Sequence, residues 1–147
     1  MPTIPYLHFQ GQAAQALAFY AEVFDGHGLT LTRYADGPGA PEAWRDEPHV
    51  MHGELRIGDG TLMASDFPPG MEGDAQKAVS VMQALPDPAA VRAAFDRLAE
   101  GGAVVQPVQE TFFSPAFGMV RDRFGTHWIL MAPPAAPPVE VEPGAGP

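Results

Sequence analysis

The sequence predicts a single α+β domain built from two similar units, each with one strand, one helix and three further strands. Two segments, 13–24 and 87–101, have the apolar spacing and end signals of helices. Each follows one strand-like run and precedes three more. At 147 residues, the chain fits one ordinary domain and is too short for two.

The first unit begins with a strand at Ile4–Gln10 and a helix at Ala13–Phe24. The helix has one apolar stripe, with residues at steps of three and four: Ala13, Ala16, Leu17, Tyr20, Val23 and Phe24. Asp25-Gly26 ends it, because glycine adopts the left-handed conformation without steric cost. Three strands follow, at Leu29–Tyr34, Val50–Ile57 and Thr61–Ser65. Gly58-Asp59-Gly60 predicts a hairpin between the last two, and long loops are expected at 35–48 and 67–74.

The second unit repeats this order from a strand at Ala78–Leu85. Asp87-Pro88 starts its helix, with an N-cap acceptor followed by proline at the first helical position. The apolar stripe of this helix comprises Val91, Ala94, Phe95 and Leu98, and Gly101-Gly102 ends it. Three short strands are expected at Val104–Val108, Gly118–Asp122 and Thr126–Met131. The two units share element order rather than literal sequence.

These elements place one domain at residues 1–132, with modules at about 3–66 and 78–132. Residues 133–147 are rich in proline, alanine and glycine, so we expect a flexible tail. The chain contains no cysteine, which excludes disulfides, thiol nucleophiles and iron–sulfur clusters. The first residues do not have the pattern of a signal peptide, and no apolar run has the length of a membrane span. We therefore expect a cytoplasmic protein.

The charge distribution limits the partners. The formal net charge is −10 and Lys77 is the one lysine in the sequence. Nucleic acids and anionic membrane surfaces are therefore poor partners, because a field of this sign repels them. Arg121 and Arg123 flank Asp122. The two arginines could form a small local anion site, but we expect a solvated ion pair with Asp122 on the surface.

Three stretches of sequence show a family resemblance over about residues 3–132. They are Pro5-Tyr6-Leu7-x-Phe9-x-Gly11 with Ala16–Tyr20, Met51–Asp59 with Leu62–Asp66, and Phe117–Val120 with Asp122, Phe124-Gly125 and Trp128. Together they resemble the PhnB-like branch of the vicinal-oxygen-chelate superfamily, which includes glyoxalase I, ring-cleaving dioxygenases and bleomycin-resistance proteins. The resemblance implies two βαβββ modules that form curved mixed sheets around a cavity, with the helices packed outside. It also implies a homodimer.

The resemblance also implies where a metal would bind. The superfamily's metal enzymes place ligands on the first and last strands of each module, at positions that correspond here to Pro5, Ile129 and the region Val79–Val81. Proline and isoleucine offer no metal ligand, so we predict no cofactor at this site. A displaced divalent-metal site remains an alternative. His52 and Glu54 share one face of a strand, and His127 shares the Ile129 face of the last strand.

The candidate residues lining the pocket are His52, Glu54, Ser65, Asp66, Phe117 and His127. Asp66 has two possible roles: a general base near His52, or a turn cap before Phe67. His8 is expected to face the helix layer. The aromatic segment Phe112–Phe117 and Trp44 could line the pocket or form a dimer interface, and the sequence leaves both open.

The leading functional hypothesis is a metal-independent protein that binds a small organic molecule. One alternative is a divalent-metal isomerase or dioxygenase that uses His52, Glu54 and His127. A second alternative is a resistance protein that sequesters a drug or toxin, with the acidic surface favouring a cationic ligand. PhnB-like proteins often carry a methyltransferase label, but neither strand-to-helix junction, Gln10–Gln12 or Pro86–Pro88, has the glycine-rich turn that S-adenosylmethionine binding requires.

Overall fold

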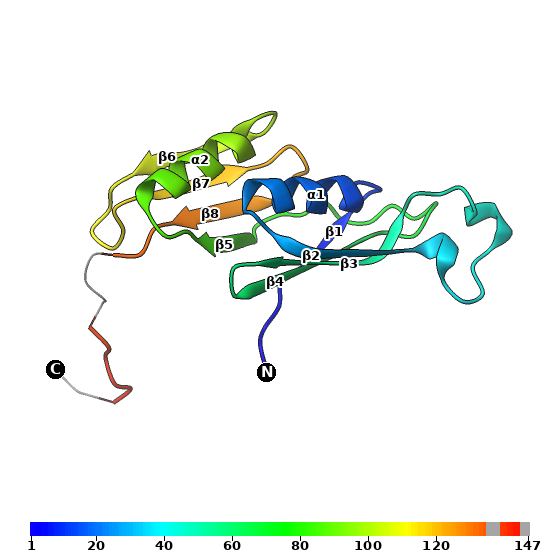
Figure 1. The fold of residues 1–147 in the computed structure, drawn as a ribbon, viewed down its shortest axis with the longest axis horizontal. Coiled ribbons are helices and arrows are strands. Elements are labelled where there is room, and N and C mark those ends of the chain that lie inside the picture. The colour runs from blue at the N-terminus through cyan, green and yellow to red at the C-terminus, as the bar shows by residue number, and fades with distance from the viewer. Residues whose placement is uncertain (135–138, 145–147) are drawn as a thin grey trace.

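The computed structural model describes residues 1–134 and 139–144, which form two modules with one four-stranded sheet each (Figure 1). Module 1 comprises β1 (Tyr6–Phe9), α1 (Ala13–Val23), β2 (His27–Arg33), β3 (Val50–Ile57) and β4 (Gly60–Asp66). Module 2 comprises β5 (Ser80–Ala84), α2 (Pro88–Ala99), β6 (Ala103–Gln109), β7 (Phe117–Arg121) and β8 (His127–Met131). This order confirms the predicted α+β class and the predicted repeat.

Both sheets have the same strand order, β1-β4-β3-β2 in sheet 1 and β5-β8-β7-β6 in sheet 2. The first strand of each module pairs in parallel with the last, and all other neighbours are antiparallel. Parallel neighbours need a long crossover, so a helix and two strands separate them in the chain. The two modules are therefore built in the same way although their sequences differ.

One helix covers one face of each sheet, and the core lies between them (Figure 1). In module 1, Leu17 and Tyr20 of α1 and Leu55 of β3 are fully buried. A Cβ atom at Gly53 of β3 would lie 2.6 Å from Leu17 Cδ1, so glycine at this position lets α1 approach the sheet. We call the opposite side of each sheet its open face, because neither α1 nor α2 covers it.

Local signals act largely as predicted at the ends of elements. The Asp87 carboxylate caps α2 by accepting a 2.8 Å hydrogen bond from the N–H of Ala90. The long loop after β2 contains two short 3₁₀-helices, η1 (Tyr34–Asp36) and η2 (Glu42–Trp44). The ring of Tyr34 packs edge-on against Trp44, with 5.7 Å between the ring centroids. These contacts give the loop structure that its glycines and prolines did not predict.

Apolar and polar residues alternate along β2, which is typical of a half-buried strand, but β2 is not half-buried. All seven of its residues are exposed, and Leu29 and Leu31 remain 37% and 43% exposed. β2 lies at the edge of sheet 1, beside β3 and furthest from β1. Alternation in a sequence identifies the two faces of a strand, but it does not show how far a covering helix extends across the sheet.

A buried carboxylate, Asp122, joins the two modules. It lies between β7 and β8, is 2% exposed, and accepts hydrogen bonds of 2.9 and 3.1 Å from the N–H groups of Phe124 and Thr126. The indole of Trp128 donates to it at 2.9 Å, and the hydroxyl of Tyr20 donates at 2.5 Å. Because Tyr20 belongs to α1, module 1 supplies one donor to a carboxylate buried in module 2.

This arrangement shows that the expected solvated ion pair at Asp122 is wrong. Successive residues of an extended segment point to opposite sides, so Asp122 faces the core while Arg121 and Arg123 are exposed. The guanidinium carbon of Arg123 lies 4.0 Å from the ring centroid of Phe19 on α1. This cation–π contact is a second link between the modules.

The predicted tail, residues 133–147, lies partly outside the described residues. Its described parts, 133–134 and 139–144, form neither helix nor strand. The domain boundary at residue 132 and the flexibility of the tail stay predictions. Within the two described ranges, no helix has the length and apolar character needed to cross a membrane.

Tyr20→Phe is expected to lower the free energy of unfolding by about 1–3 kcal/mol at pH 7, because the buried Asp122 carboxylate loses one donor. Tyr34→Phe is the control, since the Tyr34 hydroxyl donates to a backbone carbonyl at a part-buried site. Its expected cost is about 1 kcal/mol or less. Urea denaturation followed by tryptophan fluorescence measures both values, and equal losses would contradict a special role for Tyr20.

Tyr20 also makes stability depend on alkaline pH. Burial, the charge of Asp122 and the hydrogen bond to it raise the pKa of Tyr20 far above its ordinary value of 10.0. The unfolded chain therefore releases the Tyr20 proton at lower pH than the folded protein does. The contribution of Tyr20 to the free energy of unfolding is complete below pH 10.0 and is lost as the pH rises above it.

We expect the free energy of unfolding to fall between about pH 10 and pH 12, and to fall less steeply in Tyr20→Phe. A residual slope is expected from Tyr34, because burial also raises the pKa of that residue. Urea denaturation at a series of alkaline pH values measures the two slopes. Identical slopes would show that Tyr20 does not carry this dependence.

Candidate functional site

The open face of sheet 1 brings together three of the six predicted site residues. His52 and Glu54 lie on β3, and Ser65 lies on β4. Their side chains alternate with the buried residues Gly53 and Ala64, which face α1. Sheet 1 therefore presents a polar surface on the side away from its helix.

A hydrogen-bonded chain of three side chains crosses this face. The Tyr6 hydroxyl lies 2.8 Å from His52 Nδ1, and His52 Nε2 lies 3.0 Å from Glu54 Oε1. A carboxylate can only accept, so Nε2 carries the proton and donates it to Glu54. Nδ1 is then left as an acceptor for the Tyr6 hydroxyl. The His52 and Glu54 side chains remain 38% and 42% exposed, so a ligand can reach them.

His8 belongs to the same face, which corrects the expectation that it faces the helix layer. Leu7 and Phe9 of β1 are buried beneath α1, so the residue between them points the other way. His8 Nδ1 lies 3.1 Å from the Ser65 hydroxyl, and Ser65 is opposite His8 in the parallel register of β1 and β4. The expectation was wrong because it placed Leu7 and Phe9 on the face away from the helix, whereas both side chains pack beneath α1.

Four aromatic rings form a continuous row on this side of the protein: His52, Tyr6, His8 and Phe67. Neighbouring ring centroids along the row are 5.6, 5.2 and 5.5 Å apart, and the His8 and Phe67 rings are stacked. We call these four residues the aromatic row. Three of its members border a cavity of about 320 Å³, whose wall also contains Lys77 and Val79. The row thus combines flat apolar surfaces with a space for a ligand.

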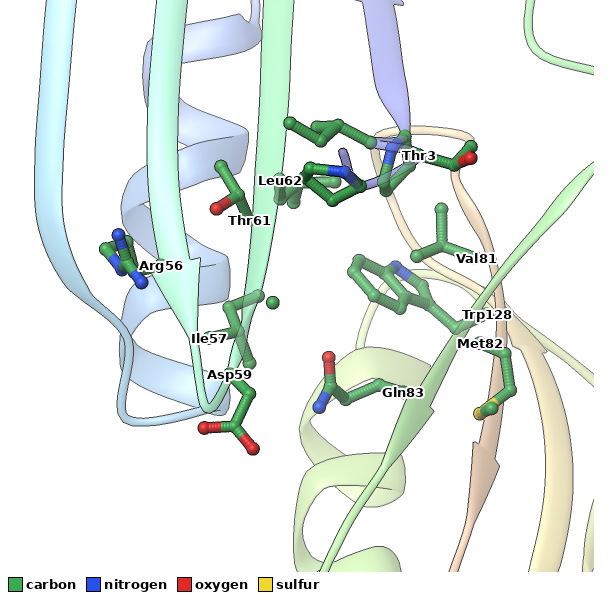
Figure 2. A pocket seen from close by; sticks show the side chains of 14 residues that line it. Thr3, Arg56, Ile57, Asp59, Thr61, Leu62, Val81, Met82, Gln83 and Trp128 are labelled. Atoms are coloured by element: carbon green, nitrogen blue, oxygen red, sulfur yellow. The ribbon is translucent and has the colours of Figure 1, made fainter.

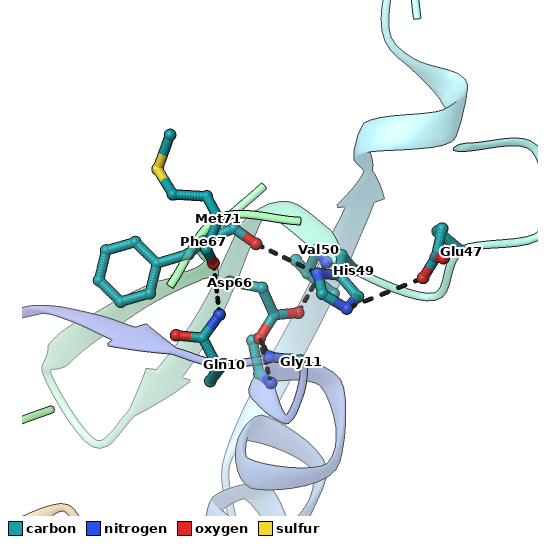
Figure 3. A network of polar contacts seen from close by, with 9 residues as sticks. Gln10, Gly11, Glu47, His49, Val50, Asp66, Phe67 and Met71 are labelled. Atoms are coloured by element: carbon teal, nitrogen blue, oxygen red, sulfur yellow. Dashed lines mark hydrogen bonds and ion pairs between the residues drawn. The ribbon is translucent and has the colours of Figure 1, made fainter. Parts of the chain in front are cut away.

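Asp66 has a different environment from Ser65, its neighbour on β4. Its carboxylate is 1% exposed and accepts hydrogen bonds of 2.8, 2.9 and 2.8 Å from the N–H groups of Gly11, Ala13 and Val50 (Figure 3). These groups lie at the start of α1 and the start of β3. Asp66 therefore caps the starts of α1 and β3 instead of the predicted turn before Phe67, and it faces the helix side of the sheet, away from His52.

A second set of contacts surrounds the Asp66 cap. His49 Nδ1 lies 3.1 Å from the carbonyl oxygen of Phe67, and its Nε2 lies 3.9 Å from Glu47 (Figure 3). The Gln10 amide donates to the carbonyl of Met71 at 2.6 Å. These contacts hold the loop after β4 close to β1, and so they hold Phe67 at the end of the aromatic row.

Phe117 and His127 lie on the open face of sheet 2. His127 of β8 is opposite Arg121 of β7, and Phe117 is opposite Met131. The alternate residues Trp128 and Leu130 are buried against the helix side. His127 is therefore on a different sheet from His52 and Glu54. Within residues 1–134 and 139–144, no group of three or more His, Cys, Asp or Glu side chains is placed to hold a metal ion.

A further cavity of about 410 Å³ lies between the modules (Figure 2). Ile57 and Leu62 of module 1 face Val81, Gln83 and Trp128 of module 2 across it. β1 begins at Tyr6 and pairs with β4 from Met63 onward, so the Gly60–Leu62 part of β4 borders this space. None of the six predicted residues lines this cavity or the cavity beside the aromatic row.

The aromatic segment Phe112–Phe117 lies at the end of β6 and the start of β7. Phe112 is fully exposed, and Phe113 packs edge-on against both Phe112 and Phe117 with centroids 5.1 Å apart. Trp44 packs on Tyr34 instead of joining this cluster. Neither Trp44 nor the Phe112–Phe117 segment contributes to the two cavities described above.

Known proteins share this arrangement of paired modules. The family model described as 3-demethylubiquinone-9 3-methyltransferase matches residues 2–131. The chain belongs to this family. It is PhnB-like, as its sequence motifs predicted, and its fold is shared by a glyoxalase/bleomycin-resistance/dioxygenase domain from Frankia sp. EAN1pec, which is 15% identical with a TM-score of 0.64.

Several relatives match this PhnB-like chain over most of their length. Protein YjdN of Escherichia coli (strain K12) is 29% identical over 139 residues, which cover 88% of this chain and 94% of that protein. The structure of PA1353 from Pseudomonas aeruginosa is 33% identical with a TM-score of 0.82, and the match covers 90% of this chain and 98% of that one. A PhnB protein from Bacillus cereus is 26% identical with a TM-score of 0.73, over 90% and 99% of the two chains.

The resemblance to the superfamily places its metal positions at Pro5 and Ile129 of this PhnB-like chain. Pro5 precedes β1 and Ile129 lies on the open face of β8, and neither side chain has an atom that binds a metal. The residues present at these positions do not fit the superfamily's metal.

Sequence inspection missed Tyr6 and placed His8 on the wrong face, yet both residues complete the site. The alternation Tyr6, His8 on β1 was visible, because both residues flank the apolar Leu7. The parallel pairing of β1 with β4 was not visible, and this pairing places His8 beside Ser65. The reach of Tyr6 across β4 to His52 also depends on the strand order of the sheet.

Asp66→Asn is expected to lower the free energy of unfolding by about 2–4 kcal/mol, because three backbone N–H groups share one charged acceptor that is itself buried. His52→Gln is the matched comparison on the open face, with an expected change of about 0.5 kcal/mol or less. Thermal and urea denaturation measure both variants. A small loss in Asp66→Asn would contradict the capping role.

Proposed function

We propose that this PhnB-like protein binds a small, planar organic molecule on the open face of sheet 1. The observation that carries the proposal is the aromatic row of His52, Tyr6, His8 and Phe67, with consecutive rings 5.2 to 5.6 Å apart. Rings that are already held in contact offer a planar ligand flat surfaces for stacking. The adjoining cavity of about 320 Å³ is within the usual size range of small-molecule sites.

The charge of the site favours a cationic ligand. Glu54 lies at one end of the row, and the chain as a whole carries a formal charge of −10. An acidic field raises the local concentration of cations, and aromatic faces attract cations through the ring quadrupole. This supports the drug-sequestering alternative within the same site, because many aromatic drugs are planar cations. Lys77, on the cavity wall, sets a limit on how far a positive group can extend there.

The proposal does not require a metal or a methyl donor. Pro5 and Ile129 offer no ligand at the superfamily's metal positions. The family's name refers to methyl transfer, but the turn between β1 and α1 contains one glycine, Gly11, and the turn between β5 and α2 contains none. Binding is therefore proposed as the activity that this surface supports best.

We also propose that a second copy of the chain covers the open faces. Sheet 2 and its loops expose several large apolar side chains: Met82, Val104, Val105, Phe112 and Phe113. Exposed apolar surface of this kind is typical of an interface between copies. A homodimer would shield these residues and enclose the aromatic row, which is open to solvent in the single protomer.

Titration with acridine orange, a planar aromatic cation, tests the proposed binding. We expect saturable binding at low salt that weakens as sodium chloride is added, because part of the attraction is electrostatic. Tyr6→Ala removes a central ring of the row and is expected to weaken binding about fivefold, equivalent to about 1 kcal/mol. Glu54→Gln is expected to weaken it about threefold.

Glu100→Gln is the control for charge, because it removes the same negative charge at the end of α2, in the helix layer. It is expected to bind the dye as the wild type does. Isothermal calorimetry and dye fluorescence give the affinities. If no variant of the row changes the affinity, or if the dye does not bind saturably, the proposed function is wrong.

A further inference from the structure

The residues Glu54, His52 and Tyr6 form a carboxylate–imidazole–hydroxyl series. Glu54 accepts the Nε2 proton of His52 at 3.0 Å, which fixes the imidazole tautomer. The free Nδ1 lies 2.8 Å from the Tyr6 hydroxyl, within reach of its proton. The order of the three groups is that of a catalytic triad, with a phenol in the position of the attacking hydroxyl.

We propose that this series activates the Tyr6 hydroxyl as a nucleophile, so that the open face of sheet 1 is an acyl-transfer site for small aryl esters. The inference rests on the proposed function in one respect, because the aromatic row would hold the aryl group of the ester. Tyr6 is the residue that touches the substrate. His52 is the general base, and Glu54 is a positioning residue that acts through His52.

The step uses the groups present and needs no other reactant than the ester and water. The Tyr6 oxygen attacks the ester carbonyl carbon, its proton passes to His52 Nδ1, and a C–O bond forms. The bond from the carbonyl carbon to the aryl oxygen then breaks, and the aryl oxide leaves with the electron pair and takes the proton from His52. Water next attacks the acylated tyrosine, releases the carboxylic acid and restores the Tyr6 hydroxyl.

The other two tyrosines, and the serine that pairs with a histidine, do not share this arrangement. Tyr20 is fully buried and donates to Asp122, and Tyr34 donates to the backbone carbonyl of Asp66. Ser65 pairs with His8, but Ser65 is 6% exposed. Tyr6 is 41% exposed, which leaves it accessible to an ester. The three tyrosines of the sequence therefore provide one test residue and two internal controls.

Acetylation by p-nitrophenyl acetate, mapped by peptide mass spectrometry over time, tests the proposal in the full chain. We expect Tyr6 to be acetylated about 100-fold faster than Tyr34, the low end of the contribution of a positioned general base. His52→Gln is expected to reduce the Tyr6 rate to that of Tyr34. His27→Gln is the matched control, because His27 lies on the edge strand β2, opposite Arg56, and does not belong to the aromatic row.

Glu54→Ala tests the positioning role. We expect it to lower the Tyr6 rate about tenfold, to leave the Tyr34 rate unchanged, and to convert the His52 imidazole from the Nε2–H tautomer to a mixture in ¹⁵N NMR spectra. A purely structural role for Glu54 would leave the tautomer unchanged. Melting curves show whether each variant folds. If a variant does not fold, the ¹⁵N NMR spectrum of the wild-type protein still shows whether His52 carries its proton on Nε2.

Three outcomes separate this inference from the proposed function. Equal acetylation of Tyr6 and Tyr34, or a Tyr6 rate that His52→Gln leaves unchanged, overturns the activated hydroxyl even if acridine orange binds. Fast acetylation of Tyr6 without dye binding supports the activated hydroxyl and overturns the ligand platform. Slower acetylation of Tyr6 in the presence of saturating dye supports both, because dye and ester then compete for one surface.

Discussion

The burial of the Asp122 carboxylate is the constraint on which the arrangement of the two modules depends. A charge removed from water is destabilising unless it is fully hydrogen-bonded, and Asp122 meets this requirement with donors from both modules. Within the described residues, no buried side-chain nitrogen or oxygen lacks a partner. Because Tyr20 must reach Asp122, α1 is held against β8, and the cavity in Figure 2 lies beside this contact.

Two buried carboxylates thus organise the fold, while a third acidic residue remains on the surface. Asp66 fixes the starts of α1 and β3, and Asp122 fixes the turn before β8. Glu54 has a histidine as its partner and is partly exposed. The structural carboxylates satisfy backbone and side-chain donors in the core. Glu54 instead orients a side chain that a ligand can reach, and this difference separates scaffold from candidate site.

The fold was largely predictable from the sequence, and the site was predictable in part. The stripes at Leu17 and Phe95, the Asp87 cap and the Gly58 turn determine local structure, so their positions could be inferred. The pair His52 and Glu54 follows from strand alternation alone. The roles of Tyr6, His8 and Asp122 depend on which strands and helices become neighbours, and spacing within one segment carries no information about that.

The equal strand orders of the two sheets give the modules the appearance of interchangeable copies, but the residues that join them are complementary. Tyr20 is the eighth residue of α1, and the eighth residue of α2 is Phe95, which has the same ring without the hydroxyl. Asp122 follows the third strand of module 2, where module 1 has Gly58. Two copies of module 1 would bring together two phenols and no carboxylate, and two copies of module 2 would bury two carboxylates without the phenol. Whatever the origin of the repeat, each half has become a partner that can pair with the other half and no longer with itself.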